Sequence, residues 1–420
     1  AIDRGLDVLV QGDRIAAIGL SGRLRPPAEA EVIDGQGGTL LPGLIDMHGH
    51  VYTASAPPWR VGLPDPSANL RSYLYSGVTT VLDPADSSND AYARRDQVAR
   101  GELLGPRIYT AGKPVTAPEG HPIAMIRIAA PWWIGWYVAP RSAFGVSSPD
   151  EARAAAEELA ADGPDFVKVI VDRIPQDAPR LGFEEVRTTV ETARKHGLRS
   201  VAHIGSLEDA RDAARAGVAL WVHGVYKERI ADAAIPELAG FGIPMVPTLV
   251  VFENYASALG GNREASALER QTAPAELLAS FNERPDHSPL LDAFRSWLVE
   301  LGQLRPAWRD NVRRLHEAGV VILAGSDPQS GVFPGPGLHR ELHLLHESGL
   351  TRAEAIRAAT LDPARFLTQS DDPDFGQVRL GTRADLLLVD GDPTADLAAL
   401  EDIREVILGG VRLERLPIGE

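Results

Sequence analysis

The residues best suited to chemistry are histidines at the ends of apolar, strand-like runs. His48 and His50 follow the run 40–47, with Gly49 between them. Residues i and i+2 of a strand project to the same face, so the two imidazoles can hold one cation from the same side. The glycine lets backbone and ligand approach closely. Such a pair also occurs on protein surfaces and in cores, so the pair alone does not establish a metal site.

Lys168 lies inside the apolar run 165–171. Lysine is rarely buried without a partner, because taking an ammonium out of water costs several kcal/mol. One interpretation is an edge strand with an outward lysine. The other is a lysine beside bound cations, where the neutral amine is favoured and can take up CO₂. The resulting carbamate has two oxygens and can bridge two metals.

Three further candidates end other strand-like runs. His203 and His223 close two successive runs, and a helix predicted over 206–216 separates them, so one βα unit places them at adjacent strand ends. Asp327 follows the run 320–324, where it is also a plausible turn residue before proline. In (β/α)₈ barrels, functional residues come from the carboxyl ends of several strands. The joint placement predicts a metal site made of His48, His50, Lys168, His203, His223 and Asp327.

Short apolar runs alternate with helical segments from about residue 41 to 327, which is typical of parallel βα architecture. The eight runs predict the eight strands of a (β/α)₈ TIM barrel, an α/β fold: 41–47, 78–82, 107–110, 166–171, 200–204, 220–225, 243–251 and 320–324. Ser148, Ser206 and Thr351 are expected helix caps. The segment 253–305 predicts helices after strand seven.

The two ends of the chain alternate apolar and polar residues around glycine-containing turns. Neither end is long enough to make a domain by itself. We therefore expect residues 1–40 and 371–420 to form one composite β-sandwich domain, and residues 41–370 to form the barrel.

Composition limits the classes of partner. The chain has 420 residues, a formal net charge of −16 and no cysteine. The negative charge argues against nucleic acid and anionic membranes, and no apolar run reaches the roughly 18 residues of a membrane span. Because the chain has no cysteine, any metal must be bound by imidazole and oxygen ligands. A small-molecule substrate is expected. The sequence does not determine the oligomeric state, and a homo-oligomer is one alternative.

Localisation is predicted to be cytoplasmic, since cysteine is absent and no anchor is visible. The chain begins at Ala1 without methionine and passes directly into the strand-like run 6–10. A cleaved export signal is therefore not excluded.

The ordered set of HxH, strand lysine, two histidines and aspartate resembles the amidohydrolase superfamily with a binuclear metal centre. Residues 41–50 are similar to the opening signature of that family, and residues 358–364 and 381–386 resemble its closing ones. The chain looks most like the imidazolonepropionase-like and Xaa-Pro dipeptidase-like branch. That branch contains amidases, dipeptidases and mycotoxin-cleaving hydrolases.

The resemblance implies that His48, His50 and Asp327 hold one divalent ion and that His203 and His223 hold the other. Carboxylated Lys168 would bridge them. Imidazole and carboxylate ligands suit Zn²⁺ first, while Mn²⁺, Co²⁺ and Ni²⁺ also fit.

One position departs from part of the superfamily. Mononuclear deaminases place a glutamate three residues after the fifth-strand histidine, where this chain has Ser206. Together with Lys168, this argues against a deaminase and against imidazolonepropionase itself.

The expected reaction is hydrolysis of an amide C–N bond, in a peptide-like compound or an N-acyl amino acid, by a metal-bridging hydroxide. Asp327 would carry the proton to the leaving nitrogen. The same centre could attack lactones, other esters or phosphotriesters. A non-catalytic metal-binding barrel is the third alternative, and an intact Asp327 argues against it.

Substrate contacts are less well encoded. The loop 131–137 is rich in aromatic residues and follows strand three, so Trp132 and Trp136 could form one wall of an apolar pocket. Alternatively, they pack a long loop or an oligomer interface. His121 and Tyr226 are the other predicted substrate contacts.

Overall fold

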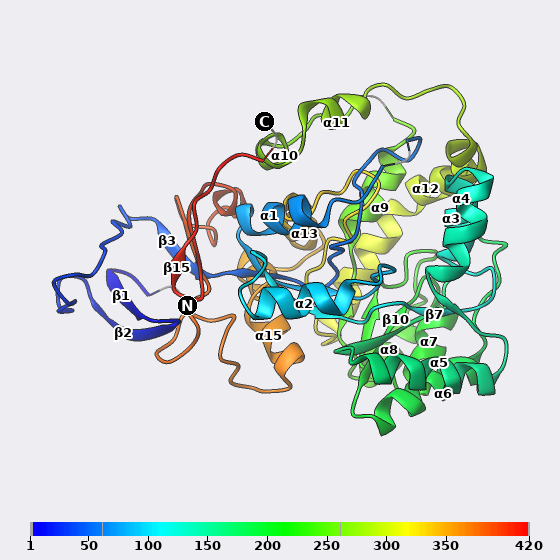
Figure 1. Ribbon diagram of the computed structural model, residues 1–420, viewed down its shortest axis with the longest axis horizontal. Coiled ribbons are helices and arrows are strands. Elements are labelled where there is room, and N and C mark those ends of the chain that lie inside the picture. The colour runs from blue at the N-terminus through cyan, green and yellow to red at the C-terminus, as the bar shows by residue number, and fades with distance from the viewer. Residues whose placement is uncertain (1–2, 61, 261, 419–420) are drawn as a thin grey trace.

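The computed structural model describes residues 3–60, 62–260 and 262–418. Two parts are visible in Figure 1: a β-rich part in which blue and red segments lie together, and a larger part of helices around parallel strands. Among the described helices, none is long and apolar enough to cross a membrane.

The central strands form a closed barrel. Two parallel sheets, in the orders β4-β5-β6 and β12-β11-β10-β9-β7-β8, supply most of its wall. The backbone N–H of Asp165, just before β9, donates to the carbonyl of Thr110 in β6 at 2.8 Å and joins the two sheets. The strands are β4 (Leu44–Asp46), β5 (Val78–Asp83), β6 (Arg107–Thr110), β7 (Val115–Thr116), β8 (Phe144–Gly145), β9 (Phe166–Ile170), β10 (Arg199–His203), β11 (Leu220–Val222) and β12 (Met245–Val246).

The eighth wall segment is irregular. Around Ile322 it makes only an isolated parallel bridge to Met245. The N–H of Met47 donates to the carbonyl of Ala324 at 2.9 Å, which brings this segment against the end of β4 and closes the ring. The predicted TIM barrel is thus confirmed, with its eighth strand reduced to a bridge.

Helices surround this ring and follow the strands as expected of βα units. Ser148, Ser206 and Thr351 accept hydrogen bonds from the third helical N–H of α5, α7 and α14. The helices are α1 (Pro66–Tyr75), α2 (Ala91–Ala99), α3 (Ile123–Ala129), α4 (Trp132–Val138), α5 (Pro149–Asp162), α6 (Phe183–Lys195), α7 (Leu207–Ala216), α8 (Ala234–Gly240), α9 (Leu249–Ser257), α10 (Ala267–Thr272), α11 (Ala275–Ser280), α12 (Pro289–Glu317), α13 (Pro336–Glu347), α14 (Arg352–Ala358) and α15 (Leu361–Thr368), with short 3₁₀ turns η1 (Ala139–Arg141) and η2 (Leu397–Leu400).

Strands from both termini form the second part. β3 (Thr39–Pro42) pairs antiparallel with β13 (Leu386–Val389) in a four-stranded sheet that also holds β14 (Ile403–Leu408) and β15 (Val411–Arg412). The hairpin of β1 (Leu6–Gln11) and β2 (Arg14–Leu20) packs Ile15 against Ala384 and Leu386. The expected β domain built from both ends is therefore present.

Three sequence predictions of elements are corrected. The run 41–47 divides between β3 of the terminal sheet and β4 of the barrel. The run 243–251 is a short strand followed by helix α9, because a continuous apolar run does not distinguish a buried strand from a buried helix. The predicted loop 131–137 is mostly helix α4.

Ser206 caps α7 through a reciprocal capping box with Asp209. We predict that Ser206→Ala lowers the free energy of unfolding by about 1 kcal/mol and leaves turnover unchanged. Denaturant unfolding and steady-state kinetics of the same preparation would measure both. A loss of activity in the fully folded variant would contradict this structural role of Ser206.

Candidate metal centre and active site

The structure brings the six predicted ligand residues to one end of the barrel. His48 and His50 follow β4, Lys168 lies within β9, His203 ends β10, and His223 follows β11. Asp327 lies beyond the irregular eighth segment. The carboxyl ends of the strands meet there, which is where barrel enzymes place their active sites.

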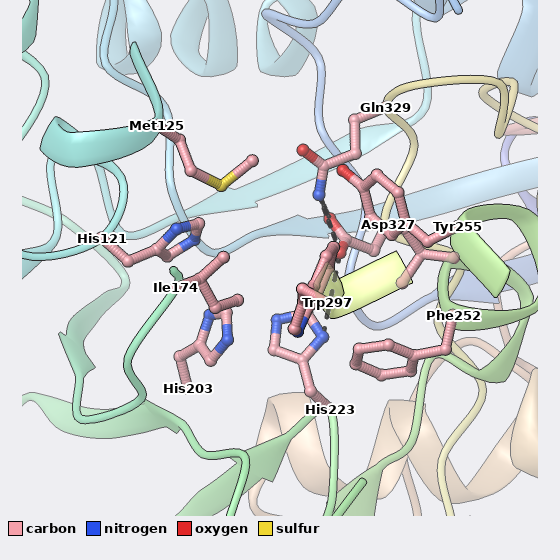
Figure 2. A pocket seen from close by; sticks show the side chains of 11 residues that line it. His121, Met125, Ile174, His203, His223, Phe252, Tyr255, Trp297, Asp327 and Gln329 are labelled. Carbon is pink, nitrogen blue, oxygen red and sulfur yellow. Dashed lines mark hydrogen bonds and ion pairs between the residues drawn. The ribbon is translucent and has the colours of Figure 1, made fainter. Parts of the chain in front are cut away.

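Three of these residues form a compact group of ligand atoms. Atoms of His48, His223 and Asp327 lie within 4.8 Å of one another, and all three residues are buried. His50 joins them through Nε2, which is 3.0 Å from Oδ1 of Asp327. The His203 and His223 rings lie 3.9 Å apart between centroids, and Figure 2 shows these two imidazoles side by side.

Lys168 is 1% exposed and lies on a central strand, paired with β10 on one side and β7 on the other. The edge-strand interpretation is therefore excluded. Its amine has no ion pair or hydrogen bond to any side chain or backbone group in the described part of the chain. Burial lowers the pKa of its amine to about 7, against the opposing charges of Asp327 and Asp83. Its positive charge also lowers the pKa values of His48, His203 and His223.

Three of the four candidate histidines are neutral, the state in which an imidazole nitrogen can bind a cation. Burial, followed by nearby positive groups, holds the pKa values of His48, His203 and His223 well below the usual range, which leaves neutral imidazoles. Nδ1 of His48 and Nε2 of His203 are buried without a hydrogen-bond partner in the described part of the chain. Buried unpaired nitrogens are costly, and a metal ion would satisfy those facing it. These residues therefore fit divalent ions.

His50 and Asp327 are paired. Burial lowers the pKa of His50, but hydrogen bonds to Asp327 and Asp83 outweigh it and raise that pKa to about 10. Burial likewise raises the pKa of Asp327, but His50 and His223 outweigh it and lower that pKa to about 2. Asp327 is thus a carboxylate surrounded by imidazoles.

Residues that the sequence interpretation missed hold the candidate ligands in place. Asp83, at the end of β5, lies 3.3 Å from Nδ1 of His50 and accepts the N–H of Val51 at 2.9 Å. Thr248 Oγ1 lies 2.8 Å from Nδ1 of His223. Gln329 Nε2 donates to both oxygens of Asp327 at 3.0 Å.

Asp172 is a further missed carboxylate, located two residues beyond β9. It accepts the hydroxyl of Tyr226 and pairs with Lys227, each at 2.5 Å, and its Oδ2 lies 3.4 Å from Nε2 of His203. Like Asp83 and Asp327, it ends an apolar run. Attention to every strand-ending aspartate would have found both missed carboxylates.

Backbone strain marks the same place. His223, Thr248 and Asp327 have φ angles of 78°, 47° and 51°, in the left-handed region that non-glycine residues rarely adopt. Such conformations cluster at functional sites because the surrounding structure has to enforce them.

The predicted substrate contacts lie in different places. His121 lines the pocket next to His203, and burial lowers its pKa to about 4. Tyr226 is 1% exposed and lies behind Asp172. Trp132 and Trp136 are 83% and 70% exposed on α4 and are not among the residues that line this pocket. The contact roles of all four remain predictions.

The apolar wall of the pocket comes from other segments. Phe252 and Tyr255 belong to α9, Trp297 to α12 and Met125 to α3, with Ile174 opposite (Figure 2). Phe252 and Tyr255 lie on the side of Asp327, and Met125 and Ile174 lie on the side of His121 (Figure 2). The space left between them is narrow, about 20 Å³, room for roughly one water.

Residues 39–413 match the model of the amidohydrolase family, and the chain belongs to this family. It is a metal-dependent hydrolase acting on carbon–nitrogen bonds.

The sequence identity to individual members and solved structures is low. An uncharacterised protein of Mycobacterium tuberculosis is 26% identical over 393 residues, covering 92% of this chain and 88% of the relative. An imidazolonepropionase of Anaeromyxobacter dehalogenans is 27% identical over 414 residues, with 91% and 84% covered. A solved Xaa-Pro dipeptidase with bound methionine in its active site is 25% identical, with a TM-score of 0.75 and 97% and 95% of the two chains covered.

Asp83 is predicted to act through His50. Asp83→Ala removes the carboxylate at Nδ1 of His50 and should lower the affinity for the divalent ion about 10- to 100-fold, the usual effect of losing a residue that orients a ligand. Titration of metal-depleted protein would measure it, with circular dichroism to check folding. Unchanged affinity in a folded variant would exclude this role.

Proposed function

We propose that this protein hydrolyses the amide bond of a small molecule, peptide-like or an N-acyl amino acid, that carries an apolar group beside the scissile bond. The observation that carries the proposal is the position of Asp327, which lies against the candidate metal ligands and also lines the apolar pocket. A substrate held by the apolar wall would place its carbonyl group next to Asp327 and next to the candidate metal ligands.

In this proposal His48, His50 and Asp327 would hold one cation, and His203 and His223 would hold the other. Zn²⁺ is the first candidate. Lys168 bridges them as a carbamate: its neutral amine nitrogen bonds to the carbon of CO₂ and loses a proton. When bound, the two cations supply acidification of water and polarisation of a carbonyl.

The side chains of the chain supply the remaining steps. Apolar contacts with Phe252, Tyr255 and Trp297 bind and orient the substrate and exclude bulk water. Water adds to the carbonyl carbon, the C–N bond breaks, and Asp327 takes the proton of the water and delivers it to the leaving nitrogen. Gln329, which donates to both carboxylate oxygens, keeps Asp327 in position for both transfers.

Substrate profiling tests this reaction. We expect N-acyl amino acids and dipeptides with apolar side chains to be hydrolysed with higher kcat/KM than matched lactones and phosphotriesters, because the pocket wall is apolar and Asp327 can protonate an amine. Faster turnover of lactones or phosphotriesters would replace the amide assignment by an esterase or phosphotriesterase one.

Asp327→Asn is the matched control for that panel. It retains shape and a ligand oxygen but cannot carry the proton, so metal should be retained while kcat falls by about two to four decades. No hydrolysis of any substrate by the metal-loaded wild type would overturn the proposed catalysis.

Metal content tests the centre separately. We expect about two divalent ions per chain, and Lys168→Ala should lose metal and activity together because the bridge is gone. Small carboxylic acids should partly restore both by replacing it. Elemental analysis of protein purified without chelators would measure the ratio. A ratio near one in supplemented wild type would contradict a binuclear centre.

A further inference from the structure

A second cavity, of about 370 Å³ and open to solvent, has a lining separate from that of the candidate metal centre; most of its lining residues are exposed, Arg141 among them. Its lining residues are Ser87, Asn89, Lys113, Tyr137, Val138 and Arg141, and none of them lines the first pocket. Ser87 and Asn89 follow β5, and Lys113 follows β6. Both strands end at the catalytic face of the barrel, so this cavity belongs to the same face.

Two cationic side chains line this cavity and carry no counter-charge. Lys113 is half-buried and has no ion pair or hydrogen bond to any residue that the structure describes. Arg141 is held in place without a carboxylate: its guanidinium lies 3.9 Å from the centroid of the Tyr137 ring, and Nη1 donates to the Tyr137 carbonyl at 2.7 Å. The lining contains no aspartate or glutamate. In a chain of net charge −16, this pair of cations favours an anion.

The cavity is also bordered by aromatic surface. Tyr137 and Val138 form the last turn of α4, at the edge of the molecule in Figure 1. Trp133 lies four residues before Tyr137, on the same helix face, and is 62% exposed. An anion with an aromatic body would therefore find both charge and apolar contact.

We propose that this cavity is a binding site for a small aromatic carboxylate. Lys113 and Arg141 bind the carboxylate, Ser87 and Asn89 add hydrogen bonds, and the aromatic residues of α4 contact the ring. The first pocket is lined by no arginine or lysine. If the proposed function is correct, an acid substrate can place its carboxylate here; otherwise a separate aromatic acid occupies the cavity.

Isothermal titration calorimetry of the metal-loaded protein with phenylacetate tests the site. We expect phenylacetate to bind and the neutral phenylacetamide to bind at least about tenfold more weakly. Lys113→Met and Arg141→Met should each weaken phenylacetate binding roughly tenfold, the effect of losing one charged hydrogen bond. The matched control is Lys195→Met, which removes the same charge at the end of α6, before β10 and thus on the opposite face; it should leave the Kd unchanged.

Carboxylate binding at the metal centre would be the same in all these variants. Equal Kd values for wild type, Lys113→Met and Arg141→Met would overturn the site, and so would absence of binding to the wild type. This result does not depend on turnover, so failure of the site and failure of the proposed catalysis are distinguishable.

Kinetics then distinguish the two sources of the carboxylate. The double variant Lys113→Met/Arg141→Met is assayed with an N-acyl amino acid substrate and with its α-carboxamide. A rise in KM confined to the acid supports the site as part of substrate recognition. Unchanged KM for both, with phenylacetate binding lost, supports it as the site of a separate ligand.

Discussion

The buried carboxylate of Asp46 holds the barrel closed where its pairing is weakest. One oxygen accepts the N–H groups of His48 and Ser326 at 3.1 and 3.0 Å, and the other accepts the Ser326 hydroxyl at 2.5 Å. This joins the first strand to the eighth segment, which has only one bridge of its own. The N–H of Asp327 donates to the carbonyl of His48 at 2.6 Å across the same seam. Ring closure and ligand placement are therefore one interaction: the seam sets the first histidine pair opposite the aspartate.

Close approach at this seam also restricts residue size. A Cβ on Gly325 would lie 2.7 Å from the backbone nitrogen of His48 and 2.5 Å from a methyl of Val246, so a side chain there would force the segments apart. Around the seam, burial lowers the pKa values of three imidazoles, while hydrogen bonds to Asp327 and Asp83 raise the pKa of His50. Burial thus leaves neutral donor nitrogens at the seam, while His50 and His223 keep Asp327 ionised against the effect of burial.

The substrate side is built differently from the ligand side. Ligands come from strand ends, whose positions follow from barrel geometry, whereas the apolar wall comes from α3, α9 and α12, which lie on long connections. Because loops and their helices vary independently of the barrel, a family can keep its chemistry and change its substrate. The cationic cavity is likewise lined by residues of connecting segments, namely those that follow β5 and β6 and those of α4 and η1.

Periodicity and strand-end spacing are local properties of the chain, so they already predicted the alternation of strands and helices, the helix caps, the β domain from both ends and the positions of the six candidate ligands. The sequence placed Lys168 inside an apolar run; only the folded chain showed that β9 is paired on both sides and that Lys168 is buried. It suggested Trp132 and Trp136 for an apolar wall, but the folded chain exposes them and brings Trp297 to the pocket from 129 residues beyond Lys168. Which side chains face a shared cavity depends on contacts between distant segments. Local sequence patterns carry no information on those contacts, which become visible only in the folded chain.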